Sequence, residues 1–235
     1  MVRARLRRGR ASGSLGAMSG APLFDLNCRR CPRLACYLDE VKEQHPDYHA
    51  RPVPSFGPER PRLLIVGLAP GVHGANRTGR PFTGDHAGKL LYQTLHALDL
   101  SSQPESVHRR DALKLRHCRI TNAVKCVPPQ NKPVGAEVRN CNDYLGAELA
   151  GVAAGGVIFA LGGVAHGAIL KALALKAKAF PFGHGNEHRL EDGRWLVDSY
   201  HCSRYNTQTR RLTTAMFRRV MRRARRLAKI PEKRG

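Results

Sequence analysis

The sequence predicts an α/β protein, a three-layer sandwich whose central four-stranded parallel sheet is covered by helices on both faces. Short apolar runs of strand length alternate along the chain with segments of helical periodicity, and strands connected through helices form parallel sheets. The chain has 235 residues, of which 42% are hydrophobic, enough for one domain with its own core. We expect that domain at residues 21–229, between a disordered basic tail (residues 1–20) and a basic C-terminal tail (residues 230–235).

The expected elements follow one another in strand–helix order. Leu63–Leu68 is too short for a helix and is bounded by turn residues, which indicates a buried strand. Ala87–Leu98 has helical periodicity, with Asp85 in a suitable position to cap it, and residues 99–117 form a polar and basic surface excursion. Further strands are expected at Arg119–Lys125, Gly156–Leu161 and Trp195–Tyr200, and further helices at Glu137–Val152, Val164–Leu175 and Thr213–Lys229.

The charge of the chain is strongly positive. Forty Lys and Arg residues against 18 Asp and Glu residues give +22 at pH 7, which favours a polyanionic partner such as nucleic acid. Residues 1–20 supply +5 and residues 218–235 supply +8, so the remainder carries +9. The net charge therefore indicates the kind of partner but does not locate its binding site.

The sequence gives no sign of membrane association. No stretch approaches 18 consecutive apolar residues, and the arginine-rich start lacks the apolar run of a secretory signal. We therefore expect a cytoplasmic protein. A transit peptide and initiation at Met18 stay open as explanations of the basic N-terminal segment.

The most informative segment is the long loop that follows the first strand and ends at Asp85. Its glycines allow backbone amides to approach a ligand closely, and ordered loops of this length are typically functional. The loop lacks the GxxxxGK[ST] and GxGxxG patterns of the common phosphate-binding sites. Ligands of parallel α/β sheets bind at the carboxyl ends of the strands. The loops after Leu68, around Asn122 and after Tyr200 should therefore converge on one site.

The seven cysteines favour metal binding or catalysis over disulfides, because disulfides are rare in cytoplasmic proteins. Cys28 and Cys31 form a CxxC motif, and fourteen residues separate Cys126 from Cys141. A lone CxxC is weak evidence, and the second pair is also compatible with ordinary buried thiols, so both interpretations stay open. We expect the others, Cys36, Cys118 and Cys202, to be small core or loop residues.

Two long segments resemble the signature motifs of the uracil-DNA glycosylase superfamily, and more narrowly of its type-5 branch. They read GLAPGVHGANRTGRPFTGD at residues 67–85 and YHCSRYNTQTRRLT at residues 200–213. The NRTGR insertion, the FTGD ending and the SRxNTxT sequence distinguish this branch from type 4. The resemblance extends roughly from Asp25 to Arg226 and implies a uracil-DNA glycosylase-like fold.

The resemblance also implies a [4Fe-4S] cluster held by Cys28, Cys31, Cys126 and Cys141. Zinc bound by the same four thiolates is the main alternative. Tetrahedral zinc sites more often use two closely spaced pairs, and the wide spacing of the second pair here favours iron–sulfur. Its role would be structural, tying the N-terminal segment to the loop after the second strand.

The implied activity is that of a monofunctional DNA glycosylase. Such an enzyme flips uracil and other deaminated bases (hypoxanthine and, as a further candidate, xanthine) out of double-stranded DNA, and hydrolyses the N-glycosidic bond. The product is an abasic site, an intermediate of base excision repair. Neither motif holds a lysine positioned for a Schiff base, so no strand cleavage is expected. We expect a monomer, and the alternative is a catalytically silent, cluster-bearing nucleic-acid-binding protein.

Three side chains are expected to act on the base. His201 would donate a hydrogen bond to the uracil carbonyl as negative charge develops there, Phe82 would stack on the ring, and Asn122 would bind the Watson–Crick edge. Each also has a plainer interpretation: a histidine satisfied at a strand end, a core phenylalanine, and a buried structural amide. Backbone amides around Gly67 and Gly71 would complete the pocket.

The residue that activates water is the least defined part of the site. Several members of the superfamily place an Asp or Asn where this chain has Ala69, which has no polar side-chain atom. Asp85 and Asn76 are the nearby candidates, although Asp85 is more simply a helix cap.

The second motif is expected to enter the DNA. Arg204 and Tyr205 are the candidates for a wedge that fills the gap left by the flipped base, whereas Ser203, Arg210 and Arg211 would bind phosphates. An exposed basic loop is otherwise simply solvated. The last basic helix is expected to track the DNA backbone, in a salt-dependent manner.

Overall fold

The computed structural model describes residues 24–232. The tail predicted at residues 1–20 lies outside the described residues, as do residues 233–235 of the predicted C-terminal tail. Ile230 is buried in the core, so packing against the domain continues past residue 229. Within residues 24–232, no helix combines the length and the apolar composition that a membrane span requires.

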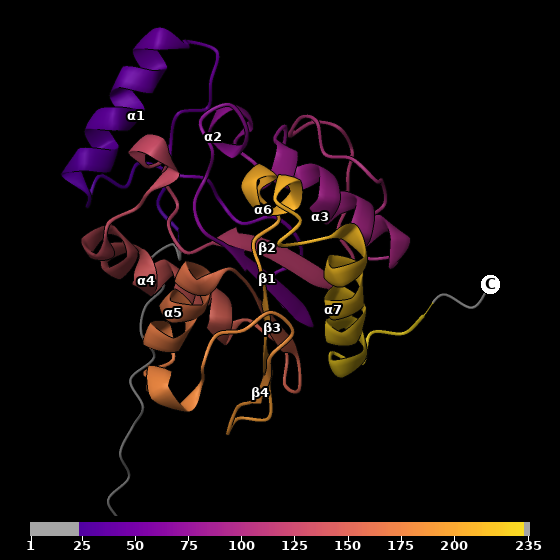
Figure 1. Ribbon diagram of the computed structural model, residues 1–235. Coiled ribbons are helices and arrows are strands. Elements are labelled where there is room, and N and C mark those ends of the chain that lie inside the picture. The colour runs from indigo at the N-terminus through magenta and orange to yellow at the C-terminus, as the bar shows by residue number, and fades with distance from the viewer. Residues whose placement is uncertain (1–23, 233–235) are drawn as a thin grey trace, which may run out of the picture.

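Four parallel strands form the centre of the fold, as the sequence predicts (Figure 1). They are β1 (Leu63–Gly67), β2 (Cys118–Asn122), β3 (Val157–Leu161) and β5 (Trp195–Ser199), in the spatial order β2-β1-β3-β5. Both β1 and β3 are buried along their whole length, which accounts for their continuous apolar sequences. The register pairs Gly67 with Asn122, so these two strand ends lie side by side.

The sheet differs from the prediction by a fifth strand, β4 (Glu187–Arg189), at its edge. β4 pairs antiparallel with β5 after a tight turn, in which Leu190 N–H donates to the Arg194 carbonyl and Gly193 adopts a φ of 84°. Three residues are too few to show an alternating pattern in the sequence, and for this reason only four strands were expected.

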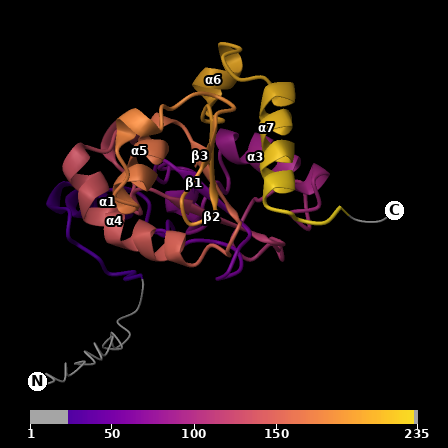
Figure 2. The same cartoon turned by 90° about the horizontal axis from the view of Figure 1, so that it is seen from below.

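Helices cover both faces of the sheet and produce the three layers (Figures 1 and 2). One face carries α3 (His86–Ala97) and α7 (Thr214–Leu227), and the other carries α4 (Gly135–Ala150) and α5 (Gly163–Ala172). The residues of β1 divide between two cores because side chains alternate along a strand. Leu63 and Ile65 pack with α3 and α7, whereas Leu64 and Val66 pack with α4 and α5.

Three helices were not expected from the sequence. α1 (Pro32–Gln44) begins with a proline, and its buried residues Leu34, Leu38 and Val41 have helical spacing. α2 (Ala75–Thr78) and α6 (Arg204–Gln208) are single turns inside the two motif loops, too short to produce a periodic signal. Two short 3-10 turns, Pro129–Asn131 and Ala177–Ala179, complete the described elements.

Candidate active site

The site lies at the carboxyl edge of the sheet, where the three predicted loops converge. A Cβ atom at Gly67, the last residue of β1, would collide with Oδ1 of Asn122 and would lie 2.6 Å from Cζ of Phe82. The rings of Phe82 and His201 are 5.9 Å apart between centroids and are tilted by 30°. Four predicted site residues from four different segments thus form one group, which we call the base group: Gly67, Phe82, Asn122 and His201.

Phe82 is fixed in an uncommon backbone conformation, with a φ of 53°. This left-handed geometry is strained for an aromatic residue and persists only where the surrounding structure enforces it. The ring is 5% exposed and lies against the glycine that ends β1. The small size of Gly67 is therefore a requirement of this arrangement.

Asn122 leaves a hydrogen-bonding atom free inside the base group. The residue is buried, and its Oδ1 atom accepts no hydrogen bond from any described residue. A buried, unpaired polar atom costs free energy, and such atoms are rare in native structures. The free carboxamide oxygen is positioned to bind a ligand placed over Gly67.

His201 is neutral at physiological pH. Burial lowers the pKa of its imidazole to about 4, because desolvation disfavours the charged form. Its carbonyl oxygen accepts a hydrogen bond from Asn206 Nδ2 at 2.8 Å, which anchors the histidine to α6. A neutral imidazole retains one N–H donor, as the predicted role of His201 requires. Asn206 was not singled out from the sequence, although it lies within the second motif.

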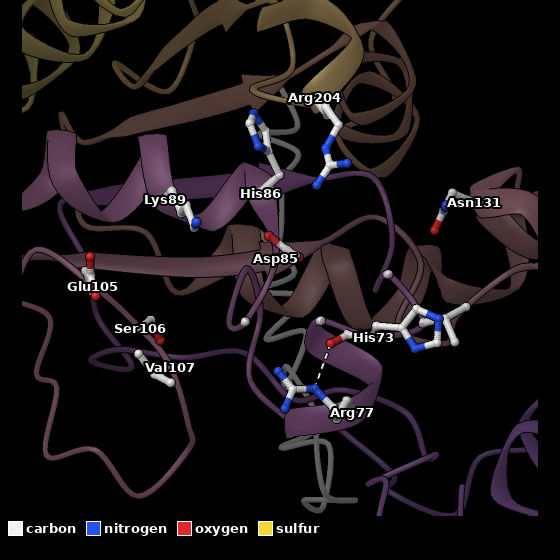
Figure 3. A pocket seen from close by; sticks show the side chains of 14 residues that line it. His73, Arg77, Asp85, His86, Lys89, Glu105, Ser106, Val107, Asn131 and Arg204 are labelled. Atoms are coloured by element: carbon white, nitrogen blue, oxygen red, sulfur yellow. Dashed lines mark hydrogen bonds between the residues drawn. The ribbon is translucent and has the colours of Figure 1, made fainter. Parts of the chain in front are cut away.

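A cavity of about 780 Å³ is lined by the first motif, the start of α3 and the excursion at residues 99–117 (Figure 3), and the four residues of the base group are not part of its lining. Three predicted residues line it: Gly71, Asp85 and Arg204. Its wall also carries residues that sequence reasoning missed, namely His73, Arg77, His86, Lys89, Glu105 and Asn131. Asn131 belongs to the PPQNKP segment, whose composition indicated only a turn. The wall carries three cations, Arg77, Lys89 and Arg204, against the two carboxylates Asp85 and Glu105, and these cations can bind phosphate groups.

Asp85 has two roles in the structure. Its Oδ1 atom accepts a hydrogen bond from Gly88 N at 2.7 Å, and this caps α3 as predicted. Burial raises the pKa of the carboxyl group, which also faces the cavity together with Lys89 and His86 (Figure 3). The cap therefore does not remove Asp85 from the site.

Two other predicted residues of the first motif, Asn76 and Ala69, do not line the cavity. Asn76 is fully buried on α2, and neither polar atom of its side chain has a partner among the described residues. Ala69 is partly buried and packs towards Val124 and its apolar neighbours beside the cysteines. Of the two candidates for positioning water, only Asp85 lines the cavity.

Part of the predicted DNA-contacting loop forms the helical turn α6. Ser203 caps this turn by accepting a hydrogen bond from Asn206 N. Tyr205 projects from this turn with 69% of its surface exposed, and Arg210 is exposed. The Arg211 guanidinium lies over the Tyr200 ring, 4.6 Å from its centroid. The turn therefore presents an aromatic side chain with basic groups around it.

The two motifs are joined directly. His86, at the start of α3, forms a hydrogen bond of 3.0 Å through Nε2 with Thr207 Oγ1 on α6. Neither residue was singled out from the sequence. The contact fixes the exposed turn of the second motif against the helix that Asp85 caps.

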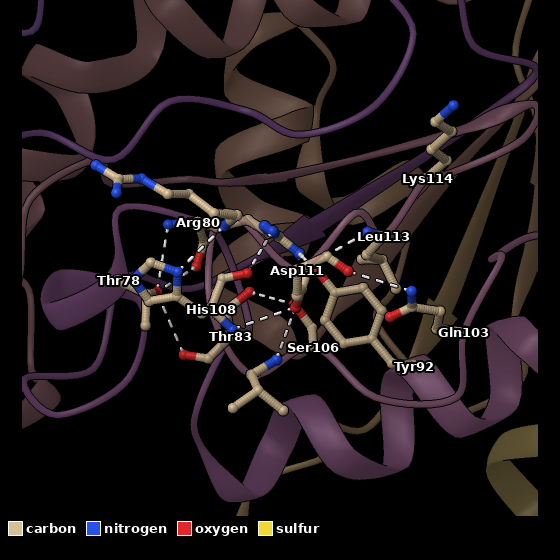
Figure 4. A network of polar contacts seen from close by, with 12 residues as sticks. Thr78, Arg80, Thr83, Tyr92, Gln103, Ser106, His108, Asp111, Leu113 and Lys114 are labelled. Carbon is tan, nitrogen blue, oxygen red and sulfur yellow. Dashed lines mark hydrogen bonds and ion pairs between the residues drawn. The ribbon is translucent and has the colours of Figure 1, made fainter.

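The excursion at residues 99–117 is tied to the first motif by a buried arginine (Figure 4). Arg80 forms an ion pair of 2.7 Å with Asp111 and donates hydrogen bonds to Ser106 Oγ and the His108 carbonyl. Gly84 N also donates to the Ser106 carbonyl. This network places the excursion against the cavity, where Ser106 and its neighbours form part of the wall.

Four cysteines come together on the other side of the β1–α2 loop. Cys31, Cys126 and Cys141 are buried in one cluster, and Cys28 is partly exposed. Burial raises the pKa of the Cys126 thiol, and the proximity of Cys141, Cys28 and Cys31 raises it further. The four thiols that the resemblance selects are therefore neighbours in space. Of the others, Cys118 and Cys202 are buried elsewhere, and Cys36 is exposed on α1.

The spacing of these thiols bears on what they could bind. A single zinc ion with Zn–S bonds of about 2.3 Å needs sulfur atoms less than about 4 Å apart. Among residues 24–232, no three His, Cys, Asp or Glu side chains converge tightly enough to hold one ion. A four-iron cluster places iron and sulfide between the thiolates, so it needs cysteines farther apart than a single zinc ion does.

Comparison with known proteins agrees with this geometry. The family model of the uracil DNA glycosylase superfamily matches residues 54–225. Type-5 uracil-DNA glycosylase of Thermus thermophilus is 48% identical over 206 residues, which cover 86% of this chain and 94% of the relative. The type-5 enzyme of Pyrobaculum aerophilum is 44% identical, with 85% and 88% covered, and that of Mycobacterium bovis is 44% identical, with 86% and 79% covered. The chain belongs to the type-5 branch of the uracil-DNA glycosylase superfamily.

Family membership confirms the resemblance carried by the two motifs and the fold that it implied. In this type-5 member the first motif supplies Phe82 and the cavity residue Asp85, and the second supplies His201 and α6. The base group is assembled from both motifs, together with the end of β2.

Replacing Arg80 with Met should lower the free energy of unfolding by about 3 kcal/mol, because Asp111 would lose the partner of a largely buried ion pair. Urea unfolding followed by circular dichroism measures this change. Arg110→Met, at an exposed position of the same excursion, should change stability by less than about 0.5 kcal/mol. Equal losses in the two variants would contradict the structural role of Arg80.

The imidazole of His201 should stay neutral until the pH approaches 4, because burial lowers its pKa. In an NMR titration its ring resonances should stay constant from pH 8 to about 5.5 and shift near pH 4. The missing peak in the spectrum of His201→Gln assigns the resonance. A transition near the ordinary value of about 6.5 would show that the ring is solvated.

Proposed function

We propose that this protein is a monofunctional DNA glycosylase that removes uracil, hypoxanthine and xanthine from double-stranded DNA and leaves an abasic site. The observation that carries the proposal is the base group, in which an aromatic ring, a free carboxamide oxygen and a neutral histidine surround a strand end without a side chain. A flipped base needs these features: a stacking surface, an edge contact and a close backbone.

The chemistry follows from where charge develops. Scission of the N-glycosidic bond leaves positive character on the sugar and negative charge on the departing base. Catalysis therefore requires stabilisation of that anion more than of the bound substrate. The N–H of the neutral His201 imidazole would donate to the base oxygen, and Phe82 would hold the ring plane. A neutral imidazole donates a hydrogen bond to the base oxygen and keeps its proton. A charged imidazolium would also attract other anionic groups of the site.

Water must then reach the sugar. Ala69 cannot orient it, and we propose that the Asp85 carboxylate does so from the cavity wall. Asn131 lies on the same wall and is positioned to share this task. An oxocarbenium-like pathway needs less help from a base than direct displacement does, which is consistent with a carboxyl group that also caps a helix.

The DNA contacts are proposed from the cavity wall and the turn of the second motif. Ser203, Arg210 and Arg211 of that turn would bind phosphates around the lesion, together with Arg77 and Lys89 of the wall. Tyr205 and Arg204, both exposed on α6, would fill the gap left by the flipped base. We expect the protein to act as a monomer in the cytoplasm.

For the cysteines we propose a [4Fe-4S] cluster bound by Cys28, Cys31, Cys126 and Cys141. When bound, it would supply a cross-link and no chemical step. It would fasten the start of α1 to the end of β2 and to α4, next to Ala69 and Val72, which pack against this cluster of residues. Burial raises the pKa of the Cys28 thiol, but hydrogen bonds from Arg30 and Tyr144 together with the charge of Arg30 lower it overall, which favours the thiolate form.

The deciding experiment is an excision assay. A duplex with one uracil is incubated with the protein and then heated in alkali, which cleaves at abasic sites. We expect cleavage only after alkali, for uracil and for hypoxanthine and xanthine duplexes. If all three strands stay intact, the catalytically silent binder is the correct interpretation.

In the same assay, Gly67→Ala should lower the excision rate by about 100-fold, because the new methyl group displaces Phe82 and Asn122 from the base group. Gly146→Ala on α4 is the matched control, since a Cβ there meets nothing within 4 Å. Binding of an undamaged duplex should be equal in the two variants. Equal excision rates would contradict the base group as the site.

Protein purified without oxygen should be brown and contain iron and acid-labile sulfide in equal amounts. Cys126→Ser should remove the colour and lower the melting temperature, whereas Cys36→Ser, at an exposed cysteine on α1, should change neither. A colourless protein with about one zinc per chain would support the alternative metal.

A further inference from the structure

The solvent-facing side of α7 is the most basic surface that the proposed function does not use. It carries five exposed arginines, Arg218, Arg219, Arg222, Arg223 and Arg226, and no acidic residue lies within the helix. Only Arg223 of these five forms an ion pair among the described residues, with Glu187 on β4. We call this surface the arginine face.

The arginine face extends away from the candidate active site. α7 begins next to α6, since Leu212 N donates to the Asn206 carbonyl. It ends at the opposite edge of the sheet, where Arg62, which precedes β1, donates to the Ala228 carbonyl at 2.6 Å. The helix therefore runs along the sheet from one edge to the other, as Figure 1 shows. Its fourteen residues give it a length of about 21 Å, so most of the arginine face lies away from the carboxyl edge.

The chemistry of the arginine face fits a phosphate backbone. Arg218, Arg222 and Arg226 form one row with a rise of about 6 Å between neighbours. Guanidinium groups bind phosphate through paired N–H donors, and a DNA strand carries a charge every 3.4 Å or so. A row of three can therefore follow one strand over several base pairs.

The same geometry argues against a membrane or an apolar peptide. The other side of α7 is occupied, because Phe217, Val220, Met221 and Ala224 are buried in the core. Amphipathic helices bind membranes through an apolar side that is free to insert. Here only charge is available to a partner.

We propose that the arginine face binds a second segment of duplex DNA while the carboxyl edge of the sheet holds the first. This inference rests on the proposed function, because the first segment is the glycosylase substrate. Two sites on one molecule allow transfer between segments without full dissociation, which speeds the search for rare lesions.

The test uses the full chain and two undamaged duplexes that carry a donor and an acceptor dye. The wild type should bring them together and produce energy transfer, whereas R218Q/R222Q/R226Q should lose it. Glutamine keeps the helix propensity of arginine, so α7 should stay folded. The slope of log K against log salt should fall by about 2.7 for the loss of three phosphate contacts.

The matched control is K171Q/K176Q/K178Q, which removes three exposed charges from α5 and the segment after it, on the opposite face of the sheet. It should retain energy transfer. Uracil excision from a short duplex is also measured, because the same basic helix is a candidate to track the backbone of the substrate duplex. If the arginine face binds a separate segment, as proposed, the arginine variant should excise within two-fold of the wild-type rate.

Three outcomes would overturn the inference. Energy transfer that persists in the arginine variant would place the second contact elsewhere. An equal loss of energy transfer in the lysine control would show that the effect comes from the net charge of the protein and not from the arginine face. Loss of excision together with energy transfer would mean that one duplex spans both surfaces. Absence of uracil excision in the wild type would refute the proposed function separately, because energy transfer is measured on undamaged DNA.

Discussion

The arrangement of the site depends on the missing side chain at Gly67. β1 and β2 are paired in register, so the end of β1 lies beside Asn122, and the Phe82 ring closes over the same point. Any larger residue would separate these groups. Because Phe82 then stands in a left-handed backbone conformation, the rest of the first motif must hold it there. The buried Arg80–Asp111 pair, the cap at Asp85 and the His86–Thr207 contact do so from three directions.

Much of this was predictable because the responsible patterns are local. The buried strands are short continuous apolar runs and the long helices have clear periodicity. The two motifs identify the family, Phe82 and His201 from short stretches of sequence. The Asp85 cap also follows from its position before a helical pattern. The convergence of the loops after Leu68 and Tyr200 follows from the topology of parallel sheets, where the carboxyl ends share one edge.

The rest could not be predicted because it depends on contacts between distant segments. Arg80 and Asp111 are 31 positions apart and carry no pattern that pairs them. Asn131 lies in a proline-rich turn that reaches the cavity only through the path of the chain after β2. The four cysteines are an intermediate case. The resemblance selected them and the fold makes them neighbours, but the metal that they bind depends on distances that the sequence does not contain. β4 and α6, with three and five residues, were missed because they are too short to show a recurring pattern in the sequence.

The distribution of charge separates two tasks that a lesion-seeking protein has to perform. At the base group, burial lowers the pKa of His201 and favours its neutral form, so in the proposed reaction its donor would act on charge as it develops rather than on the polyanion as a whole. Along the cavity and α7, exposed cations attract DNA irrespective of its sequence, with an energy that salt screens. A cation inside the base group would favour every phosphate equally and would blur the distinction between damaged and undamaged DNA. In the proposed reaction the uncharged interior and the basic exterior have complementary roles. The exterior would concentrate DNA at the edge of the sheet, and only a base that enters the interior would meet the histidine.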